Sequence, residues 1–76
     1  MKNLNIKLDS INKVKTFVNT ISSFDGDFDL ASDRYVVDAK SIMGIFSLDL
    51  SSVLRLDVHD EKDYEKVSND LKDFTV

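Results

Sequence analysis

The spacing of apolar residues changes repeatedly along this chain, and that change limits the possible folds more than any other feature of the sequence. A half-buried strand alternates apolar and polar residues, whereas a helix with one buried face repeats an apolar residue every three to four positions. Helical spacing predicts helices from Ile11 to Phe24 and from Glu61 to Phe74. Alternation of apolar and polar residues predicts four strands, at residues 4–8, 27–30, 35–39 and 53–58. The alternation is weaker in the third of these, residues 35–39.

Turn-forming residues separate these segments. Asp9-Ser10 supplies cap chemistry before the first helix, and Gly26 follows that helix in a position where we expect a left-handed conformation. The short turn at 32–34 makes the second and third strands an antiparallel hairpin. The two long helices each have one apolar face, and a sheet with one apolar face can cover both. The order βαββαβα therefore predicts an α+β fold: an open-faced β-sandwich whose four-stranded antiparallel sheet is covered on one face by helices, in a single domain over residues 1–76.

Composition narrows the class of protein. The chain has 76 residues and no cysteine, which excludes a disulfide framework and a thiolate metal site. Its net charge of −4 disfavours direct binding to nucleic acid or to an anionic membrane. No apolar run approaches the length of about 20 residues that a membrane span needs, and the start lacks the apolar stretch of a secretory signal. We therefore expect a cytoplasmic protein.

Neither a metal site nor an enzyme active site is expected. An acidic run surrounds the second strand: Asp25, Asp27, Asp29 and Asp33. An EF-hand loop beginning at Asp25 would place Leu30 at its glycine position and Val36 at its glutamate position, so that motif fails. His59 is the only histidine, which excludes a site with several histidines. No nucleophile–base pair stands out, and a chain this small has little room for a deep pocket. We expect no cofactor.

The segment from Ser41 to Leu50 is too apolar for its length. One or two helical turns cannot bury all of its apolar side chains on one side, so some of Ile42, Met43 and Phe46 should face solvent. An exposed apolar patch on a small domain indicates a binding partner.

The run Lys40-Ser41-Ile42-Met43-Gly44-Ile45-Phe46-Ser47-Leu48 resembles the HPr family, the small phosphocarriers of the bacterial sugar phosphotransferase system. Phe24 falls where that family has the phenylalanine that closes its first helix, and the strand order and length agree. The resemblance implies a histidine phosphoacceptor at the start of the first helix, followed by alanine, arginine and proline. Counting back from Phe24 places Ser10 at the histidine position, and a gapped alignment places Asn12 there. Neither is a histidine, and His59 follows the fourth strand.

A hydroxyl or an amide cannot form the labile phosphoimidazole, so we predict that this chain does not carry phosphoryl groups to sugar permeases. The resemblance implies a second role, in which the serine matching Ser41 is phosphorylated by an HPr kinase/phosphorylase and the product binds a LacI-type transcriptional regulator. Catabolite-repression HPr, a branch lacking the histidine, keeps only this role. Ile42, Met43 and Phe46 would then form the docking surface. The alternatives are a phosphocarrier with Ser10 or His59 as an unusual acceptor, and a degenerate paralogue that binds an unrelated partner. We expect a monomer or a weak homodimer.

Overall fold

The structure, a computed structural model, describes residues 2–76. Its strands are β1 (Lys2–Ile6), β2 (Phe28–Ala31), β3 (Val36–Asp38) and β4 (Leu54–Val58). Its helices are α1 (Ile11–Ser22), α2 (Ile42–Phe46) and α3 (Tyr64–Asp70), the last preceded by the 3-10 turn η1 (Glu61–Asp63). This is the predicted βαββαβα order. The predicted single domain includes Met1, which lies outside the described residues.

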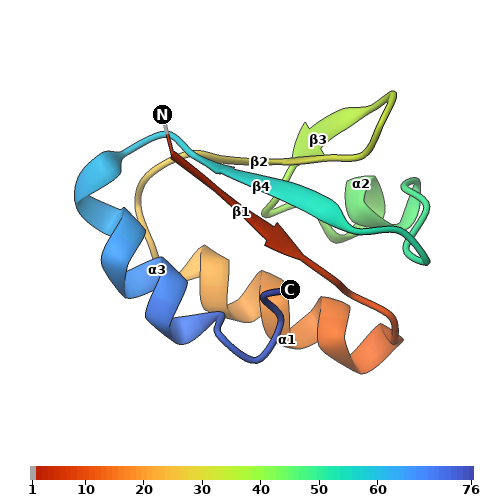
Figure 1. Ribbon diagram of the computed structural model, residues 1–76, viewed down its shortest axis with the longest axis horizontal. Helices are drawn as coiled ribbons and strands as arrows, with labels where there is room; N and C mark the ends of the chain where they lie inside the picture. Colours follow the sequence, from red (N-terminus) through yellow and green to blue (C-terminus); the bar gives the residue numbers. More distant parts are fainter. Residues whose placement is uncertain (1) are drawn as a thin grey trace.

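The four strands form one antiparallel sheet in the order β1-β4-β2-β3, which confirms the predicted sheet. Figure 1 shows β4 between β1 and β2, with β3 outermost. β2 and β3 are joined by a tight turn in which the amide of Ser32 donates to the carbonyl oxygen of Tyr35 at 2.9 Å. The predicted hairpin is therefore present, although β3 is shorter than the alternation indicated.

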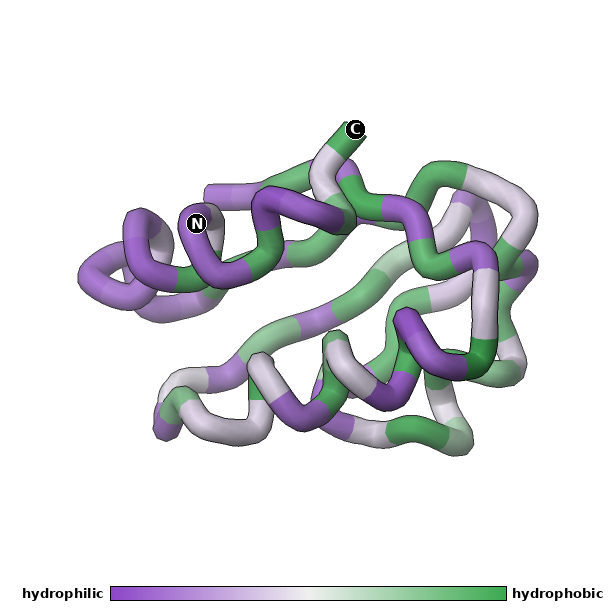
Figure 2. Tube along the Cα trace, turned by 90° about the horizontal axis from the view of Figure 1, so that it is seen from below, coloured by the Kyte–Doolittle hydropathy of each residue, from purple (hydrophilic) through white to green (hydrophobic). Residues whose placement is uncertain are grey.

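Side-chain alternation gives the sheet one apolar face, and the helices cover it. Leu4 and Ile6 of β1 lie opposite Leu56 and Leu54 of β4, and all four are buried. Figure 1 shows α1 and α3 on the same side of the sheet, and Figure 2 shows that the segment through η1 and α3 is largely hydrophilic. No helix within residues 2–76 is long and apolar enough to cross a membrane.

The core is built from the faces that the helical spacing predicted. Val14, Phe17 and Ile21 of α1 are fully buried, and the ring of Phe24 packs edge-on against Phe28 with centroids 5.9 Å apart. Each such side chain contributes about 1.5–3 kcal/mol by leaving water, so these few residues dominate the stability of a domain of this size.

The predicted extent of the last helix is wrong, because α3 ends at Asp70 and the chain then turns back toward β1. Leu71 and Phe74 are both buried, and their three-residue spacing is satisfied by successive turns as well as by a helix. The carbonyl oxygen of Phe74 accepts from the amide of Lys7 at 2.9 Å, and the amide of Val76 donates to the carbonyl oxygen of Asn5 at 3.0 Å. The C-terminal residues thus cover the outer edge of β1 at its last residues.

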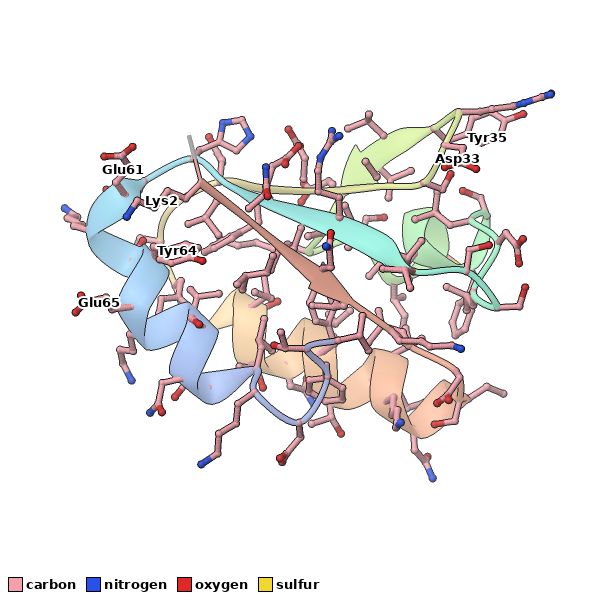
Figure 3. The ribbon with its side chains drawn as sticks, in the orientation of Figure 1. Lys2, Asp33, Tyr35, Glu61, Tyr64 and Glu65 are labelled. Carbon is pink, nitrogen blue, oxygen red and sulfur yellow. The ribbon has the colours of Figure 1, made fainter. Side chains whose placement is uncertain are left out.

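Gly26 also differs from the prediction, since no residue within 2–76 has a positive φ. A Cβ at this position would lie 2.9 Å from Oδ2 of Asp63 and 3.3 Å from Cβ of Asp60. The glycine therefore permits the close approach of the α1–β2 loop to η1. Lys2 ties the same region to the sheet, because its ammonium lies 5.0 Å from the centroid of the Tyr64 ring (Figure 3).

Candidate functional site

The start of α1 is where the family resemblance places the phosphoacceptor, and here it holds a capping serine. Oγ of Ser10 accepts from the amide of Lys13 at 3.1 Å, so its hydroxyl serves as the helix N-cap. Asn12 is exposed in the first turn. Asp9 forms an ion pair with Lys13 at 3.0 Å, and the hydrogen bond and charge of Lys13 lower the pKa of Asp9 below its ordinary value.

Ile11 is the residue at this end that the periodicity misplaced. It falls on the predicted apolar face of the helix, yet 62% of it is exposed. Figure 1 gives the reason, because the first turn of α1 lies beyond the end of β1 and has no sheet above it. A groove of about 330 Å³ runs from Leu8 and Ile11 to Leu50, in the loop that follows α2. The start of α1 and the loop after α2 thus line one groove.

Ser41 caps α2 in the same way that Ser10 caps α1. Its Oγ accepts from the amide of Gly44 at 3.1 Å, and its carbonyl oxygen accepts from the amide of Ile45 at 3.0 Å. A Cβ on Gly44 would lie 3.2 Å from Oγ of Ser41 and 3.2 Å from Cβ of Val37. The glycine therefore lets the short helix pack closely on β3 while the serine closes its first turn. The side chain of Ser41 remains exposed.

The apolar residues of α2 divide as the crowding argument predicted. Ile45 is fully buried, and Ile42 is half-buried against the core. Met43 is 77% exposed and Phe46 is 41% exposed. We call the exposed pair Met43 and Phe46 the docking face. Methionine and aromatic side chains suit such a surface because they adapt to, and bury well against, a partner.

Lys40, directly before the capping serine, is turned away from it. Its ammonium donates to the carbonyl oxygen of Phe24 at 2.6 Å and lies 5.7 Å from the centroid of the Phe28 ring. This contact places a positive charge just beyond the C-terminal end of α1, where the helix dipole favours it. Lys40 therefore fastens the segment before α2 to the end of α1, and its charge is not beside Ser41.

The loop after α2 is closed by Asp49. Its carboxylate accepts from the amide and the hydroxyl of Ser51 and from the hydroxyl of Ser52, at 2.6–3.1 Å. These hydrogen bonds lower the pKa of Asp49. The loop is thereby held in one shape, which positions Leu50 against the start of α1.

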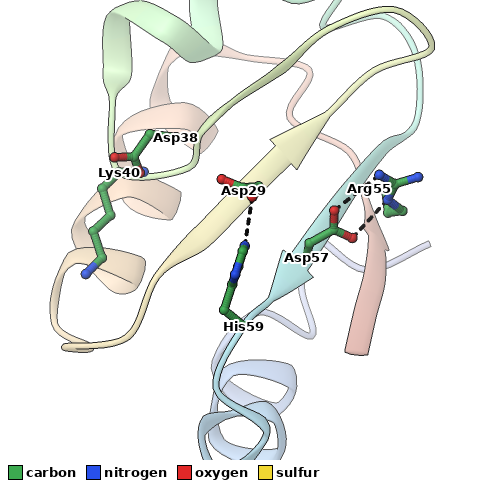
Figure 4. A network of polar contacts seen from close by, with 6 residues as sticks. All are labelled: Asp29, Asp38, Lys40, Arg55, Asp57 and His59. Carbon is green, nitrogen blue, oxygen red and sulfur yellow. Dashed lines mark hydrogen bonds and ion pairs between the residues drawn. The ribbon is translucent and has the colours of Figure 1, made fainter. Parts of the chain in front are cut away.

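His59 lies at the opposite end of the sheet from Ser10. Residue pairing places Ile6, which leads toward α1, beside Leu54, and Lys2 beside Val58. His59 therefore follows β4 at the Lys2 end. Its Nε2 is 2.7 Å from Oδ2 of Asp29 on β2 (Figure 4). The geometry separates the only imidazole of the chain from the start of the first helix.

The open face of the sheet carries a row of carboxylates across three strands. Asp57 of β4 lies opposite Asp29 of β2, which lies opposite Asp38 of β3. Arg55 makes two hydrogen bonds to Asp57, at 2.9 and 3.2 Å, and His59 contacts Asp29. Like charges directly opposite each other are unfavourable; the Arg55 guanidinium offsets the charge of Asp57, and the His59 ring contacts Asp29 by a hydrogen bond. Among residues 2–76, no group of three or more ligating side chains is arranged to hold a metal ion.

Comparison with solved structures finds close relatives of this fold. The crystal structure of HPr-C-His from Thermoanaerobacter tengcongensis matches with a TM-score of 0.80 and 32% sequence identity, over 96% of this chain and 89% of that chain. A phosphocarrier protein HPr from Bacillus anthracis str. Ames matches with a TM-score of 0.68 and 25% identity, over 91% of this chain and 92% of that one. No protein-family model matches the chain, and no match is found among curated proteins.

Proposed function

The chain belongs to the HPr family, and on this basis we propose that it is a regulatory protein-interaction module switched by phosphorylation of Ser41, not a phosphoryl carrier. One observation carries the proposal. An exposed serine hydroxyl caps α2 beside the exposed Met43 and Phe46, while the start of α1 offers only Ser10 and Asn12. The exposed hydroxyl and its apolar neighbours support a signalling role at α2, and the absence of a histidine at the start of α1 argues against phosphoryl transfer there.

The chemistry at α1 argues against transfer. A carrier must accept a phosphoryl group on an atom that releases it readily, and the imidazole does so because the phosphorus–nitrogen bond is labile. Phosphate esters of serine are stable, and an asparagine amide is a poor nucleophile. His59 has the right chemistry, but it is paired with Asp29 at the other end of the sheet.

The surroundings of Ser41 support a switch that leaves the fold intact. The side chain is exposed, so a phosphate on Oγ would extend into solvent next to the first-turn amides of α2. It would add a charge of about −1.5 to −2 at neutral pH. Because α2 has only five residues, these amides would contribute more than the small helix dipole.

The charges nearby indicate how a partner would recognise the modified form. Lys40 is occupied at the end of α1, and the carboxylate of Asp38 accepts from the amide of Lys40 two residues before the serine. The phosphate would therefore lack a cation from its own segment and would add to local negative charge. A partner that offers an arginine or lysine for the phosphate, and an apolar surface for Met43 and Phe46, fits both features.

The partners that the family suggests are an HPr kinase/phosphorylase and a LacI-type transcriptional regulator, both in the cytoplasm. The first experiment incubates the protein with an HPr kinase and ATP and measures the intact mass. We expect a gain of one phosphate on the wild type and on Ser10→Ala, and no gain on Ser41→Ala. Ser10→Ala is the matched control because it removes an equivalent capping hydroxyl. No gain on the wild type, or an undiminished gain on Ser41→Ala, would reject the switch.

The second experiment tests the alternative role as a carrier. Phosphoenolpyruvate and the first enzyme of the phosphotransferase system should leave the protein unlabelled. An acid-labile phosphate that disappears in His59→Ala would instead identify His59 as an acceptor and overturn the assignment. An acid-stable phosphate that disappears in Ser10→Ala would do the same for Ser10.

A further inference from the structure

The two edge strands of the sheet, β1 and β3, differ in whether another segment of the chain pairs with them on the outer side. The last residues of β1 are covered by the C-terminal residues 74–76, through the bridge between Ile6 and Thr75 and the bond from Val76 to Asn5. The edge of β3 has no strand beside it within the described residues. An uncovered edge presents unpaired amide and carbonyl groups to any other strand.

The hydrogen bonds of the hairpin show which groups of β3 point outward. The carbonyl oxygen of Tyr35 and the amide of Ala39 both bond toward β2. Because facing alternates along an antiparallel strand, Val37 also faces β2 and Val36 turns its backbone groups to the free edge, whereas the carbonyl oxygen of Asp38 accepts from the amide of Ser41 at 3.0 Å. The amide and the carbonyl oxygen of Val36 are thus available to an added strand.

The side chains at this edge are unusually apolar for an exposed position. Tyr35 and Val36 are each 61% exposed, and successive residues of a strand point to opposite faces. Figure 3 shows Tyr35 and Asp33 at the outer end of the hairpin, away from the body of the domain. Natural edge strands are protected by proline, by charged side chains such as lysine, or by short length; β3 (Val36–Asp38) has no proline or lysine, and its protection is limited to its three-residue length and Asp38.

Two charges at this edge lack partners of opposite sign. Asp38 is the member of the carboxylate row that neither Arg55 nor His59 reaches, and no basic side chain pairs with it among residues 2–76. Arg34, in the turn before β3, forms no ion pair with any acidic side chain in the same part of the chain. The cation and the anion lie four residues apart, on either side of Val36.

We propose that a second copy of this chain pairs antiparallel with β3, about a two-fold axis at Val36, to form a homodimer with a continuous eight-stranded sheet. In that register Val36 faces its own counterpart, and their two pairs of backbone groups exchange hydrogen bonds. Arg34 of each copy comes beside Asp38 of the other. The arrangement offsets the third carboxylate of the row and covers Val36. It requires no phosphorylation, so it is independent of the switch at Ser41.

The affinity should be low, since β3 has only three residues and the proposed register brings together only residues 34–38 of each copy. Sedimentation from micromolar to millimolar concentration should therefore show a reversible monomer–dimer equilibrium for the unmodified protein. Hydrogen exchange at the Val36 amide should slow as concentration rises, while exchange in β1 does not change. A monomer at every concentration, or concentration-dependent protection at β1 or α2 instead, would overturn the proposal.

Variants with matched controls sharpen the test. Val36→Lys would place two like charges at the axis and should abolish dimerisation, whereas Val53→Lys, at a valine that is 52% exposed elsewhere, should not. Arg34→Asp should weaken association about tenfold, because two favourable pairs become unfavourable. Lys15→Asp, on the exposed side of α1, makes the same change of charge and should have little effect.

Charge reversal between two variants tests the register itself. Arg34→Asp and Asp38→Arg should each be poorer dimers alone, because each creates like-charge pairs with itself. Mixed together they should associate, since both contacts between unlike copies become attractive. Thermal melts establish that each variant is folded, and if Asp38→Arg is not, Val36→Lys and Arg34→Asp alone still decide the outcome. No preference of the mixture over the separate variants would reject the register.

Discussion

Replacing Ser41 with alanine should cost stability that an aspartate at the same position retains. The Oγ of Ser41 accepts from the amide of Gly44 at 3.1 Å, and this bond satisfies one of the few free amides of a five-residue helix. Loss of such a cap costs about 1 kcal/mol. For a domain of this length that corresponds to a fall of about 4–8 °C in Tm. Aspartate is an equally good cap, so Ser41→Asp should unfold close to the wild type.

The measurement is a pair of urea and thermal melts for each variant, with Ser10→Ala as reference. The two capping bonds have the same length, 3.1 Å, and both hydroxyls are exposed, so the two alanine variants should lose similar stability. The neighbouring carboxylate of Asp38 predicts a small additional loss for Ser41→Asp, which added salt should reduce.

Two results would refute this reasoning. If Ser41→Ala unfolds with the wild type, the hydroxyl does not hold the helix, and the shape of the docking face does not depend on it. If Ser41→Asp is as unstable as Ser41→Ala, a charged group at this position is not tolerated by the first turn. A phosphate would then disturb α2, and phosphorylation would act by loosening the helix instead of by adding charge to an intact surface.

Three further predictions concern the rest of the molecule. Lys13→Gln should raise the pKa of Asp9 toward its ordinary value of 3.8 in an NMR titration, and an unchanged titration would contradict this. Because the pKa of Asp9 is lowered in the folded state, its pair with Lys13 stabilises the fold at pH values above 3.8. That contribution is lost as the pH falls through the folded-state pKa. Deleting residues 75–76 should cost about 1 kcal/mol in urea unfolding, since it removes the backbone bond to Asn5, and should speed amide exchange in β1; unchanged exchange would mean that the edge was not covered. Phe17→Ala should cost about 3–5 kcal/mol, because this ring is fully buried, and a smaller loss would show that the core collapses around the cavity.

Local spacing was enough to predict the main elements, because each is amphipathic in its own right. The three-to-four-residue repeat of Val14, Phe17 and Ile21 identifies α1 from the sequence alone. The exposure of Met43 and Phe46 was also predictable, since it follows from counting apolar residues in a short segment. In both cases the pattern that supports the prediction lies within a short stretch of the sequence.

What could not be predicted depends on residues that are far apart in the sequence. Residues 71–76 turn back after α3 because they can form hydrogen bonds to the edge of β1, a strand far away in the sequence. Their three-residue apolar spacing does not reveal this, because it fits a series of turns as well as a helix. A glycine is needed at position 26 because η1, more than thirty residues later in the sequence, approaches it closely, and not because its backbone conformation requires one. Ile11 is exposed because the helix begins beyond the sheet, which periodicity does not register.

The carboxylate row shows most clearly how topology creates a property that no segment contains. Asp29, Asp38 and Asp57 come from three strands, and only the order β4-β2-β3 places them side by side. Two side chains reach two of these aspartates: the guanidinium of Arg55 on β4 itself, and the imidazole of His59 on the residue after it. The third aspartate sits on the edge strand, where no strand of its own chain can bring a cation on the outer side. Asp38 is exposed, so water solvates its charge, and in the proposed dimer Arg34 of the other copy would lie beside it as well.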